Sequence, residues 1–390
     1  MNARPIPRSH AIYTIAIIGF IYTLHLVIPM YSNSSFLSLF TDERTVGYIY
    51  MAGAATTILG FLLAPPLIRR FGNYTVVLWL IIAQFALFYL LITSSSSFII
   101  SFAFILQSAV ISLIGLTLDI FLEVYTDSNN VGSVRGLYTA TLNASWVIAP
   151  FIGSMLVNGT DNYRNTYMAG IAMLIPLFYL IYRNFPRFKD PGYTHLSPHQ
   201  LIRHVARNHN WIKLFSANII LQTFYAWMTV YTPIYLHSTL HFNWDQIGII
   251  LVIMLLPFPL IQYPLGVAAD KKYGEKEIMI SGFIIMGLAT IALSYISAPS
   301  IFMWALVLAA TRVGAAAAEI MIETYFFKTV STKDAAALGI FRITRPLSYF
   351  TGPLVGIVGM MFISTQWMFA VIGIMVLLAL IPIATIRDTN

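Results

Sequence analysis

Long apolar segments fill most of this 390-residue chain and restrict it to one class of structure. Hydrophobic residues make up 58% of the chain and charged residues only 9%, whereas a soluble domain carries roughly 25% charged residues. A helix needs about 20 apolar residues to cross a bilayer, and its backbone polar groups are all hydrogen-bonded within the helix. Segments of this length predict twelve transmembrane helices, at roughly 11–31, 45–68, 74–94, 98–125, 135–157, 166–184, 211–236, 246–266, 277–297, 300–327, 335–363 and 367–386.

Segments this long and uniformly apolar predict an all-α membrane protein rather than a β-barrel. Loops on the cytoplasmic side of a membrane carry an excess of Lys and Arg. With the N-terminus placed in the cytoplasm, the inner side holds 17 of the 22 basic residues, and the outer side holds only Arg44 and Arg164. We therefore expect a multi-pass protein of the plasma (inner) membrane with both termini in the cytoplasm. The net charge of +7 reflects this orientation, and we expect no nucleic-acid partner.

A recurring heptapeptide divides the chain into two related halves. Asp119–Tyr125 (DIFLEVY) returns 200 residues later as Glu319–Tyr325 (EIMIETY). Internal symmetry of this kind is typical of secondary transporters. Other landmarks recur at offsets of 201 to 203: Gly47 with Gly248, Gly72 with Gly274, Gly136 with Gly339, Pro150 with Pro353 and Gly153 with Gly356.

The duplication predicts three parts: an N-terminal six-helix bundle at residues 1–184, a cytoplasmic linker at 185–210 and a C-terminal six-helix bundle at 211–390. In the linker, Ser197 and Pro198 are typical of a helix start, so HQLIRHVARN is expected to form a short amphipathic helix. The linker histidines share no helix face and no carboxylate lies among them, so we expect no metal site. Absence of cysteine excludes disulfides and thiol chemistry.

The segment from Gly266 to Lys276 (GVAADKKYGEK) resembles the inner-loop signature of the major facilitator superfamily, a Gly, an Asp four positions later and basic residues around a second Gly. This copy has one extra residue between Asp270 and Gly274. The first-half counterpart, APPLIRRFGN, has Ile68 in place of the Asp. The resemblance covers essentially the whole chain, as twelve spans in two halves joined by a longer basic loop.

An Asp in such a loop can accept hydrogen bonds from backbone amides at the start of an adjacent helix, while the basic residues face lipid headgroups. We interpret Asp270 as a latch that holds the cytoplasmic side closed; the alternative is that the loop is only a topology signal. A second resemblance is to the Gly-Pro motif of the superfamily's antiporters, at APFIG (149–153) and GPLVG (352–356). Pro kinks a helix and small residues allow close helix packing.

Arg312 is the ionisable residue predicted to lie deepest in the membrane. It is about 16 Å along the helix that starts near Ile301, at 1.5 Å per residue. A charge at that depth costs roughly 2.5–3.5 kcal/mol on the insertion scale. Arg312 is therefore our first candidate for contact with substrate or counter-ion; the alternative is a buried structural ion pair.

Other ionisable residues gather near the predicted cytoplasmic ends of the helices and are candidates for gating or coupling. Neighbouring acids repel one another when both are charged, which makes it easier for one to take up a proton. A static packing network is the alternative. We expect two clusters, Asp119 and Glu123 with Arg135, and Glu319 and Glu323 with Arg342 and Arg345.

In this superfamily, the first, fourth, seventh and tenth helices line the cavity. The first predicted helix offers Tyr22 and His25, three positions apart, and the seventh offers Asn218, Gln222 and Tyr225 at helical spacing. We take these five residues as candidates for substrate binding. A buried, hydrogen-bonded His25 and purely structural aromatics are the alternatives.

The resemblance implies secondary active transport of a small solute by alternating access, as symport or antiport, and we expect a proton as coupling ion. Sugar or organic-acid uptake and drug or metabolite efflux both stay open. We expect a monomer in the lipid bilayer without cofactors. The sequence has no nucleotide-binding GxxxxGK loop. The alternatives are a transporter-like sensor or assembly factor, or a polytopic membrane enzyme.

Overall fold

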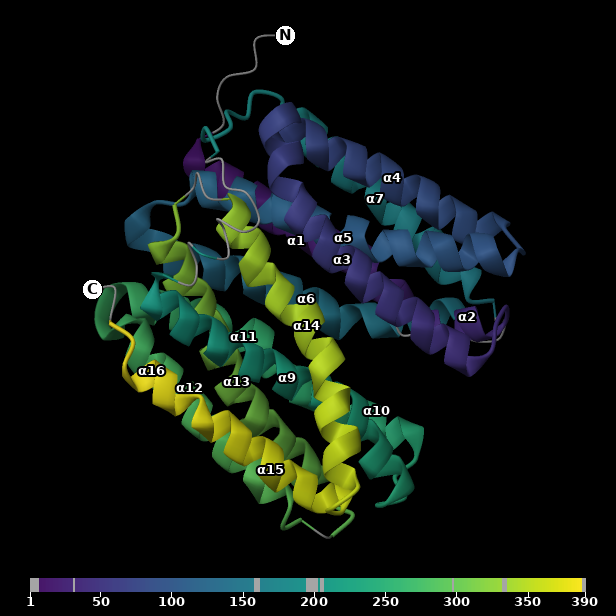
Figure 1. Cartoon of the computed structure of the whole chain (residues 1–390), viewed down its shortest axis with the longest axis vertical. Coiled ribbons are helices and arrows are strands. Elements are labelled where there is room, and N and C mark those ends of the chain that lie inside the picture. Colours follow the sequence, from purple (N-terminus) through teal and green to yellow (C-terminus); the bar gives the residue numbers. More distant parts are fainter. Residues whose placement is uncertain are drawn as a thin grey trace. The chain divides into compact units, whose positions relative to one another are not determined.

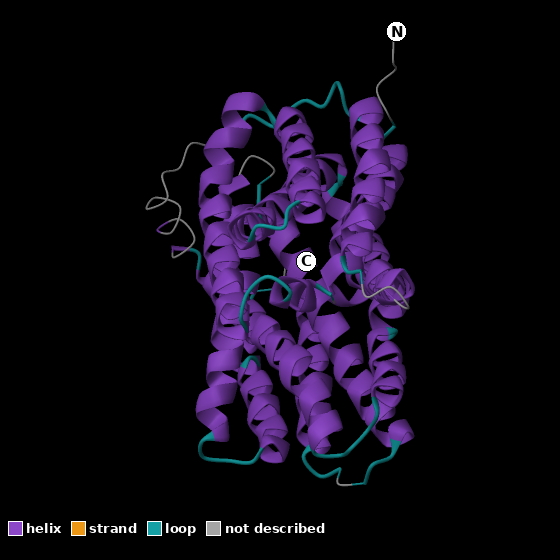
Figure 2. Cartoon of the chain, turned by 90° about the vertical axis from the view of Figure 1, so that its right-hand side faces the viewer, coloured by secondary structure: helices purple, strands orange, loops and turns teal. Residues whose placement is uncertain are grey.

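The computed structural model describes residues 7–30, 32–157, 162–193, 203, 207–296, 298–331 and 335–387. Over these ranges, the regular elements are helices joined by loops (Figure 2). Figure 1 labels the helices, which are α1 (Arg8–Met30), α2 (Asn33–Ser38), α3 (Glu43–Phe71), α4 (Asn73–Thr93), α5 (Ser97–Tyr125), α6 (Val131–Val157), α7 (Arg164–Asn184), α9 (His209–Ser238), α10 (Trp244–Leu255), α11 (Pro257–Ala268), α12 (Gly274–Leu293), α13 (Ile301–Thr329), α14 (Ala335–Met360), α15 (Thr365–Leu378) and α16 (Leu380–Ala384).

The twelve predicted apolar segments all fall in these helices. Ten spans among the described residues are long and apolar enough to cross a membrane. Two of the ten run through pairs of shorter helices, α10 with α11 and α15 with α16. The two other predicted segments are α9 and α14, which are of similar length and carry more polar side chains, such as Gln222 in α9 and Arg342 in α14. The prediction of an all-α membrane protein is confirmed.

The helices pack into two compact units. Unit 1 comprises Met1–Thr126, Thr141–Leu201 and Val330–Ile343, and unit 2 comprises Asp127–Ala140, Ile202–Thr329 and Thr344–Asn390. The first turns of α6 therefore pack with unit 2, and the first turns of α14 pack with unit 1. The predicted division at 1–184, 185–210 and 211–390 stays a prediction, and the expected linker helix lies largely outside the described residues.

Two recurring glycines occupy equivalent turns in the two halves. Gly72, between α3 and α4, has a φ of +80°, and Gly274, at the start of α12, has a φ of +68°. Only glycine adopts this region of φ without a steric cost. The repetition of these two residues in the sequence therefore has a backbone reason in the structure.

The extra residue in the second signature loop is accommodated by a π-helical turn. This turn spans Ala269–Tyr273 and contains Asp270. A π turn takes one more residue than an α turn without ending the helix. The insertion therefore changes the helix locally, and Gly274 still begins α12.

Glycines bring α6 and α11 into backbone contact inside unit 2. A Cβ atom added at Gly266 would lie 2.1 Å from the carbonyl oxygen of Gly132. One added at Gly136 would lie 2.7 Å from the carbonyl oxygen of Gln262. Small residues allow this approach, which holds the start of α6 next to the loop that carries Asp270.

We expect Gly266→Ala to lower the stability of the protein by about 1–3 kcal/mol, because its Cβ would overlap backbone atoms that have no side-chain rotation available for relief. Gly248→Ala in α10 is the matched control, since its Cβ would meet nothing within 4 Å and alanine favours a helix more than glycine does. Thermal unfolding of the purified variants checks this. Equal melting temperatures for the two variants would contradict the close packing.

Candidate functional site

Asp270 connects the π turn to the start of α6 within unit 2. Its carboxylate accepts hydrogen bonds from the backbone amides of Gly132 (3.0 Å) and Ser133 (2.6 Å), and from the Ser133 hydroxyl (2.8 Å). Its side chain is only 3% exposed. The hydrogen bonds expected from the sequence, between this Asp and amides at a helix start, are therefore present. Its role as a latch stays a prediction.

Lys328, near the end of α13, lies between two carboxylates of unit 2. Its Nζ atom is 3.4 Å from Asp270 Oδ1 and 2.5 Å from Glu275 Oε1. Glu275 is fully buried in the first turn of α12, where the helix dipole also favours an acid. The sequence analysis selected neither Lys328 nor Glu275 as a site residue. An acid directly after the second signature Gly was the available signal.

The start of α4 in unit 1 is capped by a residue that the sequence analysis also missed. Asp190, which follows α7, accepts a hydrogen bond from the backbone amide of Asn73 at 2.9 Å. The Tyr193 hydroxyl donates to the same carboxylate oxygen. Burial and the neighbouring carboxylate raise the pKa of Tyr193. Unit 1, which has Ile68 in place of the signature Asp, thus places an acid from a different segment at this turn.

A buried cluster in unit 2 joins α6, α11 and α13. The Arg135 guanidinium is 4.0 Å from Glu323 Oε2 and lies over the Phe327 ring at 3.0 Å from its centroid. One helical turn before Glu323, Glu319 accepts a hydrogen bond from the Gln262 amide at 2.8 Å. The Arg135 side chain is 1% exposed. Two acids, a cation and an amide therefore share one buried region.

Unit 1 holds the corresponding ion pair. Arg342 Nε donates to Asp119 Oδ2 at 2.7 Å, and the two side chains are 29% and 5% exposed. Glu123 is buried one helical turn beyond Asp119. This pair is more accessible to water than the Arg135 pair, because Arg342 is partly exposed.

Each unit contains one ion pair that the sequence analysis did not expect: Asp119 with Arg342 in unit 1, and Glu323 with Arg135 in unit 2. These pairs form because the first turns of α6 pack with unit 2 and those of α14 with unit 1. The expected pairs, Asp119 with Arg135 and Glu323 with Arg342, have their members in different units and stay predictions. Arg345, expected beside the second-half acids, is an exposed residue of α14.

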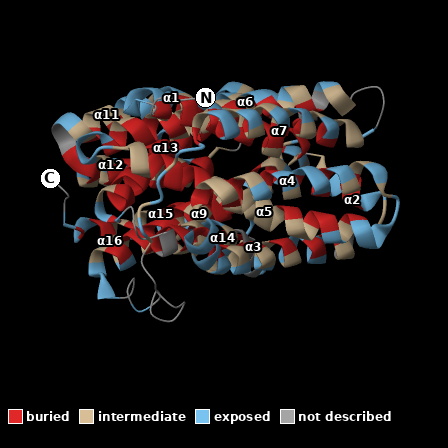
Figure 3. Ribbon diagram, turned by 90° about the horizontal axis from the view of Figure 1, so that it is seen from above, coloured by how far each residue is buried: buried red, intermediate tan, exposed pale blue. Residues whose placement is uncertain are grey.

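Arg312 lies within α13, a helix that is buried along most of its length (Figure 3). The residue is 3% exposed. Its guanidinium carbon is 5.1 Å from the centroid of the Phe224 ring and 5.7 Å from that of Tyr225, both on α9. The Tyr225 hydroxyl is 3.4 Å from the Ala315 carbonyl oxygen of α13. The structure therefore brings together two of the predicted binding residues, Arg312 and Tyr225, with aromatic rings around the charge.

The other candidates on α9 differ in their surroundings. Asn218 donates to the Thr344 hydroxyl of α14 at 2.8 Å in a buried contact, so this side chain connects two helices of unit 2. Gln222 is half-buried, one turn away from Asn218 and less than one turn from Tyr225. Of the α9 candidates, Tyr225 is the one in contact with Arg312.

The α1 candidates lie in the interior of unit 1. The Tyr22 hydroxyl donates to the carbonyl oxygen of Ile111 in α5 at 2.8 Å. His25 is fully buried, its Nδ1 is hydrogen-bonded to the Tyr22 carbonyl oxygen, and its ring packs against Phe88 of α4 at 5.9 Å between centroids. This arrangement favours the structural alternative for His25.

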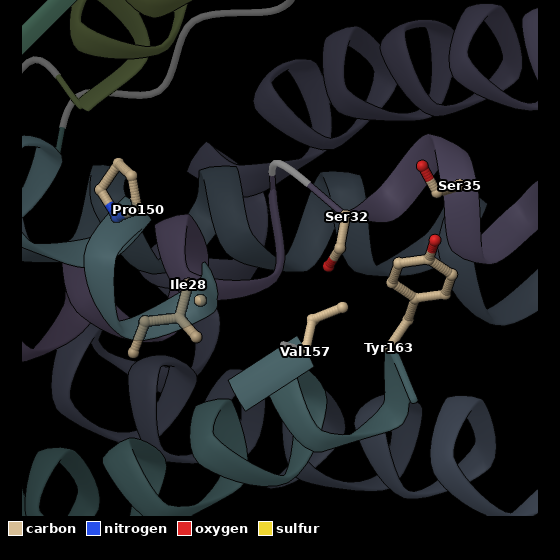
Figure 4. A pocket seen from close by; sticks show the side chains of 7 residues that line it. Ile28, Ser32, Ser35, Pro150, Val157 and Tyr163 are labelled. Carbon is tan, nitrogen blue, oxygen red and sulfur yellow. The ribbon is translucent and has the colours of Figure 1, made fainter. Parts of the chain in front are cut away.

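A cavity of about 220 Å³ opens in unit 1 between the ends of α1 and α6. Figure 4 shows Ser32, Val157 and Tyr163 grouped at one end and Ile28 with Pro150 at the other. Gly153 also lines it, and a Cβ there would lie 2.8 Å from the Ile28 carbonyl oxygen. The APFIG segment therefore places a close helix contact and a mostly apolar hollow side by side.

The family model described as Major Facilitator Superfamily matches residues 11–244 and 228–389 of the chain. The chain belongs to the major facilitator superfamily. The predicted resemblance is thus confirmed, and with it a multi-pass membrane transporter class rather than an enzyme class.

Solved structures of superfamily transporters share this fold. The human organic anion transporter MFSD10 (TETRAN) is 14% identical, with a TM-score of 0.81 over 97% of this chain and 100% of that chain. The E. coli fucose:proton symporter FucP is 10% identical, with a TM-score of 0.81 over 98% and 100%. A FucP structure in the outward conformation is 11% identical with the same score and coverage. No curated protein sequence matches the chain. Identities this low establish the fold alone.

In this superfamily member, we expect Asp270→Asn to loosen the start of α6. The charged carboxylate makes hydrogen bonds worth about 1.5–3 kcal/mol each, and loss of part of this shifts the population by about tenfold toward states in which α6 is released. Because the chain has no cysteine, a Thr139→Cys probe on α6 reports this as faster labelling.

Asp127→Asn, the same change at an exposed acid just before α6, is the matched control and should leave the labelling rate at Thr139→Cys unchanged. If Asp270→Asn labels no faster than this control, the loop is only a topology signal.

Proposed function

We propose that the protein is a proton-coupled secondary transporter of a small organic anion. In this proposal, the two homologous halves rock about a site near the middle of the membrane and open it to one side at a time. The observation that supports an anionic substrate is the position of Arg312, a permanent cation that is buried in the apolar helix α13.

The surroundings of Arg312 support an anionic ligand. Aromatic rings attract a cation through their faces, and the N–H donors of a guanidinium lie in its plane. A solute carboxylate can accept two parallel hydrogen bonds from these donors. The rings of Phe224 and Tyr225 would then contact the apolar part of the same solute. An amphipathic carboxylate therefore fits this site better than a neutral sugar.

The buried acids support a proton as the coupling ion. Asp119 with Arg342, and Glu319 and Glu323 with Arg135 and Gln262, place carboxylates inside ion-pair clusters. Protonation of such an acid weakens its ion pair and changes the relative stability of two conformations. We assign to these clusters, with Glu123, Arg345 and the Asp270 latch, the gating and coupling of transport.

The names of two structural neighbours are compatible with this proposal, although the likeness to them is one of fold. One is called an organic anion transporter and the other a fucose:proton symporter. The distribution of basic residues supports a cytoplasmic location for both termini at the plasma (inner) membrane. We further propose that the protein acts as a monomer.

Counterflow in proteoliposomes tests the proposal. Vesicles with purified protein would be loaded with unlabelled solute and assayed against labelled aliphatic carboxylates, aromatic carboxylates, neutral sugars and organic cations. We expect carboxylate exchange, and net uptake that responds to an imposed pH gradient and is abolished by a protonophore. Exchange of neutral sugars alone would contradict an anionic substrate. Net uptake that responds neither to the pH gradient nor to the protonophore would contradict proton coupling. Absence of exchange for every class would favour a sensor.

A further inference from the structure

A basic hollow lies at one end of unit 2, apart from the residues assigned to transport. Its volume is about 610 Å³, and three cationic side chains line it. The described residues that line it are Arg207, Asn208, His209, Asn210, Lys213, Thr385 and Arg387, and none of these is an acid. As far as the structure describes this wall, it therefore carries positive charge and no carboxylate.

Hydrogen bonds fix the walls of this hollow. Lys213 Nζ donates to the Thr385 carbonyl oxygen at 2.8 Å, and the Arg387 carbonyl oxygen accepts from the Tyr325 hydroxyl of α13 at 2.7 Å. The Asn208 side chain accepts from the amides of Asn210 and Trp211 and thereby caps α9. The segment after α16 is therefore held beside the start of α9, and the backbone amides at that start are already satisfied in part.

The hollow lies at the level of the membrane surface. It is formed where α9 begins and α16 ends, and spans of this kind end where the hydrocarbon core meets the headgroups. Below it, α9 packs against α15 and α16, and the three helices expose the apolar side chains of Ile212 (42%), Leu378 (54%) and Ile381 (68%), respectively. A ligand that bound here would have its charge in the hollow and apolar surface directly beneath.

We propose that this hollow binds the phosphate headgroup of an anionic phospholipid, whose acyl chains lie along the exposed apolar side chains of α9, α15 and α16. Charge complementarity selects an anion, since Arg207, Lys213 and Arg387 surround the space. The apolar surface beneath selects a lipid over a soluble phosphate. This inference does not depend on the identity of the transported solute.

Lipid titration of the full-length purified protein tests this proposal. Phosphatidylglycerol, phosphatidylcholine and inorganic phosphate would each be added to protein in neutral detergent, with bound lipid measured by native mass spectrometry. We expect selective binding of phosphatidylglycerol. In Arg207→Gln/Arg387→Gln its affinity should fall about 25-fold, at roughly fivefold for each cation removed from a membrane surface.

The matched control is Arg69→Gln/Arg70→Gln, which removes two exposed basic residues at the end of α3 in unit 1 and should keep the wild-type affinity. Arg207→Lys/Arg387→Lys keeps both charges and should bind within about twofold of wild type. If the Lys variant lost as much affinity as the Gln variant, the loss would come from altered folding and not from the missing charge. An unchanged affinity in the Gln variant would overturn the proposal, and so would an equal loss in the control. Competition by millimolar inorganic phosphate would assign the hollow to a soluble anion instead.

Discussion

Arg312→Ala is expected to reduce solute transport by about 100-fold while the protein still inserts and folds. Two charge-assisted hydrogen bonds to a carboxylate are worth about 3 kcal/mol together, which corresponds to this factor. The guanidinium is buried in α13 beside Phe224 and Tyr225. Its removal loses these aromatic contacts but also removes a costly buried charge. We therefore expect the variant without ligand to melt at or above the wild-type temperature.

Transport in proteoliposomes and ligand-induced thermal stabilisation measure this effect together. Arg312→Lys should retain part of the activity, about a tenth, because lysine keeps the charge but lacks the planar fork. Arg164→Ala is the matched control: Arg164 also lies near an aromatic ring, that of Phe40 at 5.8 Å, but at the start of α7. Normal transport by Arg312→Ala would remove this residue from the site. A loss of several kcal/mol in stability would instead assign it to a structural ion pair.

Arg135→Ala should lower the stability of the protein by about 3–5 kcal/mol, since it leaves buried acids without their cation. The Arg135 side chain is 1% exposed and contacts both Glu323 and the Phe327 ring. The equivalent change in unit 1, Arg342→Ala, should cost less. Arg342 is 29% exposed, so water can replace part of its interaction with Asp119.

Unfolding of both variants in detergent checks this difference. The double variant Arg135→Met/Glu323→Gln should recover most of the loss, because replacement of both charges leaves neither buried alone. Arg342→Ala serves as the comparison that carries the same side-chain truncation. If Arg135→Ala were no less stable than Arg342→Ala, or if the double variant recovered nothing, the cluster would not be a buried ion pair.

The membrane class, the helices and the family could be predicted from the sequence because they depend on local properties. Hydropathy sums the transfer free energies of neighbouring residues, so each apolar run marks its own helix without reference to any other. The sequence analysis also expected Asp270 to accept hydrogen bonds from amides at a helix start, but only the tertiary structure shows that this start is that of α6. Recurring glycines such as Gly72 and Gly274 marked turns that require a positive φ.

The partners of the buried charges were decided only by the tertiary structure. Depth along a helix limits which residues share a level in the membrane, but several cations share the level of Asp119 and Glu323. The sequence analysis expected Arg135 beside the first acid, and helix packing places Arg342 there. Likewise, helical spacing grouped Tyr22 with His25 but could not tell that both side chains face neighbouring helices of their own unit. Hydropathy and spacing describe one helix at a time, whereas an ion pair or a binding site depends on which faces of distant helices meet.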